Sequence, residues 1–137
     1  MTSPSPKVWL ITGCSTGLGA SLAIHALKAG HTVVAPARNQ SSAPSYAQIT
    51  SLGGRWLTLD VNSPTAGDIV QEGVKLAGGR SDVLVNNAGY SILGAMDDIS
   101  VNQTGMSEGL ARQVSPLGIR VLIVEPSAFC TQFLVSF

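Results

Sequence analysis

The sequence has few charges, few cysteines and no long apolar run. Charged residues make up 12% of its 137 positions, and eight basic residues balance eight acidic ones, so nothing predicts a nucleic-acid or anionic-membrane partner. No apolar run approaches the roughly 18 residues that a membrane span needs. The two cysteines, Cys14 and Cys130, show no metal-ligand spacing and cannot form a disulfide-rich scaffold. These absences favour a soluble, cytoplasmic protein without a metal site.

Length and composition predict one domain. A chain of 137 residues with 45% hydrophobic content can bury a core of ordinary size, but it is near the size of a single domain. The first residues, MTSPSP, are rich in serine and proline, and no linker or internal repeat follows them. We therefore predict a flexible leader at residues 1–6 and a single domain at residues 7–137.

What the sequence does have is a regular alternation of apolar runs and segments with helical spacing. The runs are short and apolar at consecutive positions, which is typical of parallel strands covered on both faces by helices. The alternation predicts the α/β class, with a doubly wound parallel sheet joined by right-handed crossovers. The predicted strands are Lys7–Thr12, His31–Ala35, Arg55–Leu59, Asp82–Val85 and Ile119–Val124, and the predicted helices are Thr16–Ala29, Ser42–Ser51, Pro64–Ala77 and Gly105–Ser115.

The stretch ITGCSTGLG joins the first predicted strand to its helix and has the spacing GxxxGxG. Gly13 permits a tight turn, while Gly17 and Gly19 allow a pyrophosphate and the neighbouring strand to approach the backbone. The N–H groups and dipole of a helix start favour an anion there. The common dinucleotide fingerprint is GxGxxG, and a P-loop would need a lysine that is absent here. The glycines alone thus leave two interpretations, a phosphate-binding turn or a plain tight turn. Cys14 is either a filler position or a thiol activated by the helix start.

Two polar residues follow the next two predicted strands. Arg38 lies about 20 residues beyond the glycine turn, where an acidic residue would bind the ribose 2′-hydroxyl of NAD and an arginine the 2′-phosphate of NADP. Arg38 therefore favours NADP(H), although a solvated surface arginine is the alternative. Asp60 is placed to accept a hydrogen bond from the amine of an adenine or to cap the helix that follows, and the two roles are compatible.

The fourth predicted strand runs into NNAG, and this motif makes a resemblance specific. Together TGCSTGLG, Arg38, the pair Asp60-Val61 and NNAG resemble the short-chain dehydrogenase/reductase family. The resemblance is colinear from about Lys7 to Ser100 and resumes from Met106 to Phe133. It implies a Rossmann-like sheet, NADP(H) at the carboxyl ends of its strands, and hydride transfer between the nicotinamide and a small carbonyl or alcohol.

The resemblance also implies which residues bind the cofactor. Asn87 corresponds to the residue around the adenine ribose, and Thr131 to the threonine at the nicotinamide end. Pro126 is followed by Ser127, where glycine is usual. The implied cofactor residues are Ile11, Gly13, Ser15, Thr16, Gly17, Leu18, Gly19, Arg38, Asp60, Val61, Asn87, Ala88, Gly89, Pro126 and Thr131.

The catalytic set that the family implies is missing from this sequence. A tyrosine general acid and a lysine normally stand as Tyr-x-x-x-Lys on one helix face, assisted by a serine on the preceding strand. Neither Tyr46 nor Tyr90 has a lysine four positions later. Where the family carries a helix, a strand and half of another helix, this chain has VNQTG after Ser100. Asn102 in that stretch is either a remnant of the asparagine that often completes the catalytic set or a loop residue.

The gap leaves both structure and function open. The missing strand normally lies between the fourth strand and Ile119–Val124, so those two strands either pair directly or leave an apolar edge exposed. As a function we predict an NADP(H)-dependent oxidoreductase by family, with impaired catalysis. The alternatives are a noncatalytic NADP(H)-binding or interaction module and a truncated product without function. The substrate and the oligomeric state are not determined by the sequence.

Overall fold

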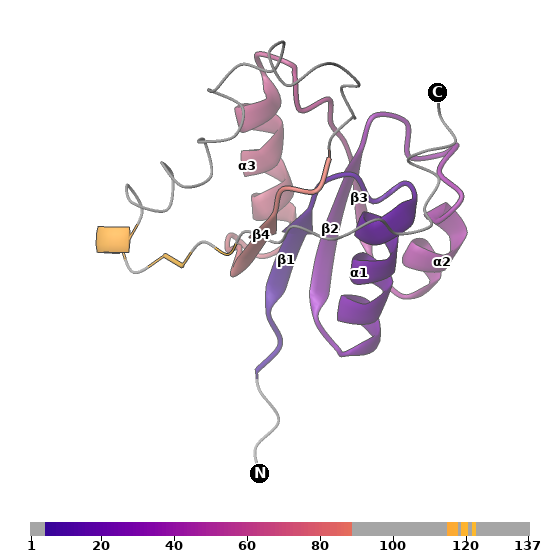
Figure 1. Ribbon diagram of the computed structural model, residues 1–137, viewed down its shortest axis with the longest axis horizontal. Helices are drawn as coiled ribbons and strands as arrows, with labels where there is room; N and C mark the ends of the chain where they lie inside the picture. Colours follow the sequence, from indigo (N-terminus) through magenta and orange to yellow (C-terminus); the bar gives the residue numbers. More distant parts are fainter. Residues whose placement is uncertain (1–4, 89–114, 118, 121, 123–137) are drawn as a thin grey trace, which may run out of the picture. The chain divides into compact units, whose positions relative to one another are not determined.

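The computed structural model describes residues 5–88, 115–117, 119–120 and 122 (Figure 1). The chain divides into two units, Met1–Tyr90 with Thr131–Phe137 and Ser91–Cys130, and each is described by itself. The leader at residues 1–6 and the single domain at residues 7–137 stay predictions. Among the helices of the described residues, none combines the length and the apolar character that crossing a membrane requires.

A parallel four-stranded sheet forms the centre of the first unit. Its strands are β1 (Val8–Ile11), β2 (Thr32–Ala37), β3 (Arg55–Thr58) and β4 (Val83–Val85), in the order β3-β2-β1-β4. The chain proceeds outward from β1 to β3 and then returns to the other side of β1 to form β4 (Figure 1). Sheets of this class bind ligands at the carboxyl ends of the strands that flank such a reversal, here β1 and β4.

Three helices cover the two faces of this sheet, α1 (Gly17–Lys28), α2 (Tyr46–Ser51) and α3 (Ala66–Leu76). Successive strand residues point to opposite faces, so Leu10 and Ile11 belong to different cores. Burial on both sides explains why β1 and β2 are apolar at consecutive positions. The core under α1 and α2 includes Ile11, Ala23, Leu27, Val33 and Ile49, and the core under α3 includes Leu10, Val34, Leu57, Ile69, Val70 and Val74.

The structure confirms the predicted elements up to β4 and moves some of their ends. The helix predicted at Ser42–Ser51 begins only at Tyr46. The Ser42 hydroxyl instead donates to the carbonyl of Asn39 (3.3 Å), a local bond that competes with helix formation. The strand predicted at His31–Ala35 extends to the end of β2 at Ala37, because its last residues pair with β3.

The strand predicted at Ile119–Val124 is wrong for its described residues. Ile119, Arg120 and Leu122 are not in a strand, and the sheet of the described residues ends at β4. An apolar, β-branched run becomes a strand only when a neighbour pairs with its backbone, so its composition alone does not make it one. The residues before them, Ser115–Leu117, form the short 3₁₀ helix η3. The rest of the helix predicted at Gly105–Ser115 lies outside the described residues.

Candidate functional site

The turn between β1 and α1 depends on three glycines. Gly13 and Gly17 have φ angles of +72° and +62°, in the left-handed region that residues with a side chain rarely adopt. A Cβ atom on Gly13 would lie 2.9 Å from the side-chain nitrogen of Asn87. A Cβ atom on Gly19 would collide with that same nitrogen and with the carbonyl oxygen of Gly13. The spacing GxxxGxG therefore reflects two backbone angles and two close approaches.

Thr12 and Asn87 fasten the end of β4 to this turn. The Thr12 hydroxyl donates to the carbonyl of Val85 (3.3 Å) and accepts the N–H groups of Asn87 (3.0 Å) and Ala88 (2.9 Å). The Asn87 side-chain nitrogen donates to the carbonyls of Thr12 (3.0 Å) and Gly13 (3.2 Å). Because Thr12 is buried, these bonds also satisfy a hydroxyl whose burial would otherwise cost free energy. Asn87 thus acts first on the shape of the turn.

Among the described residues, no side chain caps the first turn of α1. Its N-cap residue, Thr16, has an extended backbone and makes no capping hydrogen bond through its side chain, and no acidic residue stands in the turn. The N–H of Ala20 makes the first bond along the helix, to the carbonyl of Thr16 (3.4 Å). The N–H groups of Gly17, Leu18 and Gly19 therefore have no acceptor within the helix. Such a helix start attracts an anion through its N–H groups and its dipole.

Arg38 and Asp60 lie at the same edge of the sheet as this turn. Arg38 directly follows β2 and is exposed. The N–H of Leu59 donates to the carbonyl of Ala37 (3.0 Å), which ties together the chain ends that carry Arg38 and Asp60. No ion pair among the described residues includes Arg38. A guanidinium in this position can bind an anionic group bidentately.

The interpretation of Asp60 as a cap of the following helix is wrong. Its carboxylate accepts the N–H of Asn62 (2.9 Å), and its carbonyl accepts the N–H of Ser63 (3.0 Å), which closes a tight turn. Several residues then precede α3, which begins at Ala66. The bond that the Asp60 carboxylate makes is therefore to a turn residue before α3. Val61, next to it, is exposed.

Cys14 is a core residue of the turn. Its side chain is fully buried beside Ile11 and Ala23, and its thiol donates to the carbonyl of Ile11 (2.9 Å). Burial raises the pKa of the Cys14 thiol to about 12. The interpretation of Cys14 as an activated thiol is therefore wrong, because desolvation disfavours the thiolate.

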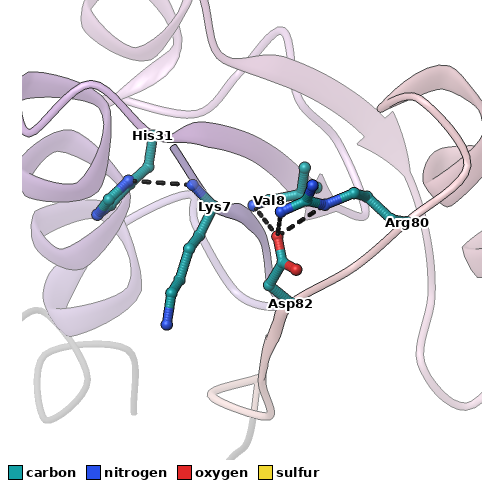
Figure 2. A network of polar contacts seen from close by, with 5 residues as sticks. All are labelled: Lys7, Val8, His31, Arg80 and Asp82. Atoms are coloured by element: carbon teal, nitrogen blue, oxygen red, sulfur yellow. Dashed lines mark hydrogen bonds and ion pairs between the residues drawn. The ribbon is translucent and has the colours of Figure 1, made fainter. Parts of the chain in front are cut away.

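Figure 2 shows the opposite, amino-terminal edge of the sheet, where backbone donors are bonded to side chains. The Asp82 carboxylate accepts the N–H of Val8 (2.7 Å) and two donors of Arg80 (3.1 and 2.7 Å). The N–H of Lys7 donates to Nδ1 of His31 (3.3 Å). The hydrogen bond from Arg80, followed by that from Val8, holds the pKa of the Asp82 carboxyl below its usual value. This network holds the start of β1 between its two neighbouring strands.

The structure thus brings most of the expected cofactor residues to one edge. Ile11 is fully buried and can offer only backbone groups there. Thr12 was not among the expected residues, although a threonine that ends a strand before a glycine is a recognisable signal. Gathered at the turn are Gly13, Ser15, Thr16, Gly17, Leu18, Gly19, Asn87 and Ala88; Arg38, Asp60 and Val61 follow the adjoining strands; Gly89, Asn102, Pro126 and Thr131 lie outside the described residues.

Sequence comparison identifies relatives of the chain. The model of the family described as short chain dehydrogenase matches residues 7–104. The oxidoreductase claN of Passalora fulva is 43% identical over 94 residues, which are 67% of this chain and 42% of that protein. The chain therefore spans less than half the length of this curated relative.

Structure comparison also finds short-chain dehydrogenases among the similar proteins. A short-chain dehydrogenase from Streptomyces avermitilis has a TM-score of 0.74 and 30% identity, over 93% of this chain and 67% of that one. The L-sorbose reductase of Gluconobacter frateurii, solved with NADPH and L-sorbose, has a TM-score of 0.58 and 30% identity, over 72% of this chain and 39% of that one. These likenesses confirm the Rossmann-like α/β fold.

Proposed function

The chain belongs to the short-chain dehydrogenase family, and from this premise we propose that it binds NADP(H) at the carboxyl-terminal edge of its sheet. The observation that carries the proposal is the uncapped start of α1 beside a glycine turn that Thr12 and Asn87 hold in place. A pyrophosphate supplies the acceptors that the first helical N–H groups lack. A relative of known structure that was solved with NADPH, the L-sorbose reductase, supports the choice of cofactor class.

Each group at this edge then has a task. The N–H groups from Ser15 to Gly19 would bind the pyrophosphate, and Arg38 would bind the 2′-phosphate that distinguishes NADP from NAD. Asp60 and Val61 would contact the adenine, while Asn87 holds the turn near the adenine ribose. The contacts of Gly89, Pro126 and Thr131 are proposed from the family resemblance alone.

We propose further that catalysis by this chain is impaired to below a measurable rate. NADP(H), when bound, would exchange a hydride with a small carbonyl or alcohol. The chain has no Tyr-x-x-x-Lys pair to move the accompanying proton. Tyr46 lies on α2 with its ring against Trp56, 5.6 Å between centroids, where it serves packing. Losing a general acid lowers a rate by about 10² to 10⁴-fold.

Binding is tested by thermal unfolding of the chain with and without NADP. A ligand that binds only the folded state stabilises it by about 2.7 kcal/mol when its concentration is a hundred times Kd. We expect one cooperative transition that moves to higher temperature with NADP, and a smaller shift with NAD at the same concentration. A transition indifferent to NADP would refute the proposed function.

Turnover is tested by following NADPH absorbance with a panel of small aldehydes and ketones. We expect no consumption above that of a heat-inactivated control. Consumption that depends on the chain would show that a different residue moves the proton. If that activity disappeared in Asn102→Ala, the interpretation of Asn102 as a loop residue would be wrong.

A further inference from the structure

Ser45 makes a contact that none of the expected site residues accounts for. It stands immediately before α2 and is buried, with 8% of its surface exposed. Its hydroxyl donates to the carbonyl oxygens of Cys14 (2.7 Å) and Ser15 (3.0 Å) in the glycine turn. The contact thus joins two connections of the fold, the one after β1 and the one after β2, at the edge where the cofactor site is proposed.

The position of Ser45 makes this use of its hydroxyl unexpected. A serine that precedes a helix usually caps it, by accepting a hydrogen bond from one of the first N–H groups. Ser45 is the N-cap residue of α2, yet its side chain makes no capping bond. Its hydroxyl is directed instead at a turn some thirty residues earlier in the chain. The contact therefore forgoes a local bond of α2 in favour of the glycine turn.

Bonding these two carbonyls fixes the direction of two N–H groups. The described peptide bonds are all trans, so each carbonyl points away from the N–H of the next residue. With the carbonyls of Cys14 and Ser15 aimed at Ser45, the N–H groups of Ser15 and Thr16 face the opposite side of the turn. Among the hydrogen bonds between described residues, none has the N–H of Ser15 as its donor.

We propose that Ser45 is a positioning residue for the site of the cofactor pyrophosphate. By holding the carbonyls of Cys14 and Ser15, it orients the N–H groups of Ser15 and Thr16, which belong to the same two peptide units. The inference rests on the proposed NADP(H) binding and deepens it. Ser45 ends the connection that begins with Arg38, so this one connection carries both the 2′-phosphate ligand and the clamp on the pyrophosphate turn. Since NAD and NADP share the pyrophosphate, Ser45 affects both nucleotides alike.

The experiment compares Ser45→Ala with Ser51→Ala in the complete chain. Ser51 is the exposed last residue of α2, and among the described residues its hydroxyl bonds only the carbonyl of Gln48 (2.8 Å). Calorimetry gives Kd for NADP and for NAD, and ¹H–¹⁵N spectra report the amides of Ser15 and Thr16 without nucleotide. We expect Ser45→Ala to raise both Kd values about tenfold with an unchanged ratio. It should also shift both amide signals, while Ser51→Ala matches the wild type.

A second substitution guards against loss of folding. Ser45→Cys retains the size of the side chain and replaces the hydroxyl by a weak donor, so we expect the same direction of change with a smaller loss of stability. The proposal is overturned if Ser45→Cys or a folded Ser45→Ala binds both nucleotides like the wild type, or if only NADP binding weakens. If the wild-type chain binds neither nucleotide, the proposed function fails, and the positioning role fails with it. If the Ser15 and Thr16 amide signals still shifted in Ser45→Ala, the contact of Ser45 with the turn would be structural and would have no part in binding.

Discussion

At the two edges of the sheet, side chains bond different backbone groups next to β1. At the amino-terminal edge, side chains bond the N–H groups of Lys7 and Val8 and leave these donors satisfied. At the carboxyl-terminal edge, Ser45 and Asn87 bond carbonyl oxygens of the glycine turn. The first edge therefore uses its polar side chains to hold the strands together. At the second edge Thr12 and Asn87 also hold β4 to the turn, and we propose that Ser45 orients N–H groups there.

This difference separates stability from binding. A backbone N–H group that is already hydrogen-bonded cannot also bind a ligand, and loss of its acceptor lowers the free energy of unfolding. A donor held in place without an acceptor contributes little to folding and is available to an anion. Substitutions at the amino-terminal edge should consequently change stability alone, and those at the carboxyl-terminal edge should change affinity, with or without a change in stability.

The largest effect is expected from Gly19→Ala, which would break the carboxyl-terminal edge. The added methyl collides with Asn87 and Gly13, so the turn must separate from the end of β4. We expect the free energy of unfolding to fall by about 1–3 kcal/mol. We also expect Kd for NADP to rise roughly a hundredfold, because each lost bond to a charged group is worth about 1.5–3 kcal/mol.

Thermal unfolding and calorimetry measure these two effects. Gly67→Ala is the matched control, since a Cβ on that α3 glycine meets nothing within 4 Å. It should keep the wild-type affinity for NADP and lose no stability. Wild-type affinity in Gly19→Ala would contradict the assignment of this turn to the cofactor.

The second prediction concerns the hydroxyl that joins the turn to β4. Thr12→Val keeps the shape of the side chain but removes the acceptor for the N–H groups of Asn87 and Ala88. We expect a loss of about 1–3 kcal/mol in unfolding free energy, measured with urea. Thr12→Ser restores the hydroxyl and should recover most of it. A wild-type free energy of unfolding in Thr12→Val would show that the hydroxyl bonds do not stabilise the fold.

The third prediction sharpens the contrast by changing affinity without stability. Arg38→Ala removes an exposed guanidinium, so the free energy of unfolding should stay the same. Kd for NADP should rise about tenfold or more while Kd for NAD stays constant, because only NADP has the 2′-phosphate. Arg55→Ala, at the exposed start of β3, is the control from the opposite edge. Equal affinities of the wild type for NADP and NAD would show that Arg38 serves no nucleotide phosphate.

The smallest effect is expected at the amino-terminal edge and depends on pH. The pKa of Asp82 is lowered in the folded chain, so the carboxylate stabilises the fold above its unfolded pKa of about 3.9. That contribution is lost as the pH falls through the lowered folded value. Asp82→Asn should therefore flatten the decline of stability below about pH 4 in urea unfolding. Kd for NADP at neutral pH should not change, and a change would break the contrast between the edges.

The fold up to β4 could be predicted from the sequence because local and global signals agree there. The apolar runs of β1 and β2 became strands covered on both faces, as the two cores show, whereas Leu84 of β4 is exposed. The run at Ile119–Val124 has the same composition, but its described residues are not in a strand. Composition makes a run compatible with a strand, but pairing with a neighbouring strand depends on the tertiary structure. The composition of this run was therefore not enough to predict a strand.

The site could be predicted in part for a similar reason. Glycine spacing predicted the turn, the position after the second strand indicated Arg38, and the family resemblance implied Asn87; their binding roles stay predictions. Ser45 and the burial of Cys14 could not be found in this way, because each depends on contacts with residues far away in the sequence. A serine before a short helix predicts a cap, and only the packing of α2 against the turn gives it another partner.

By itself, the sequence determined the kinds of elements up to β4, their order and the place of the glycine turn, since these follow from spacing and from the steric freedom of glycine. The tertiary structure decided which backbone N–H groups near β1 have a hydrogen-bond acceptor among the described residues. Hydrogen bonds across the ends of β1, β2 and β4 close one edge and orient the other. These bonds join residues distant in sequence, and only the parallel packing of the strands brings them within reach.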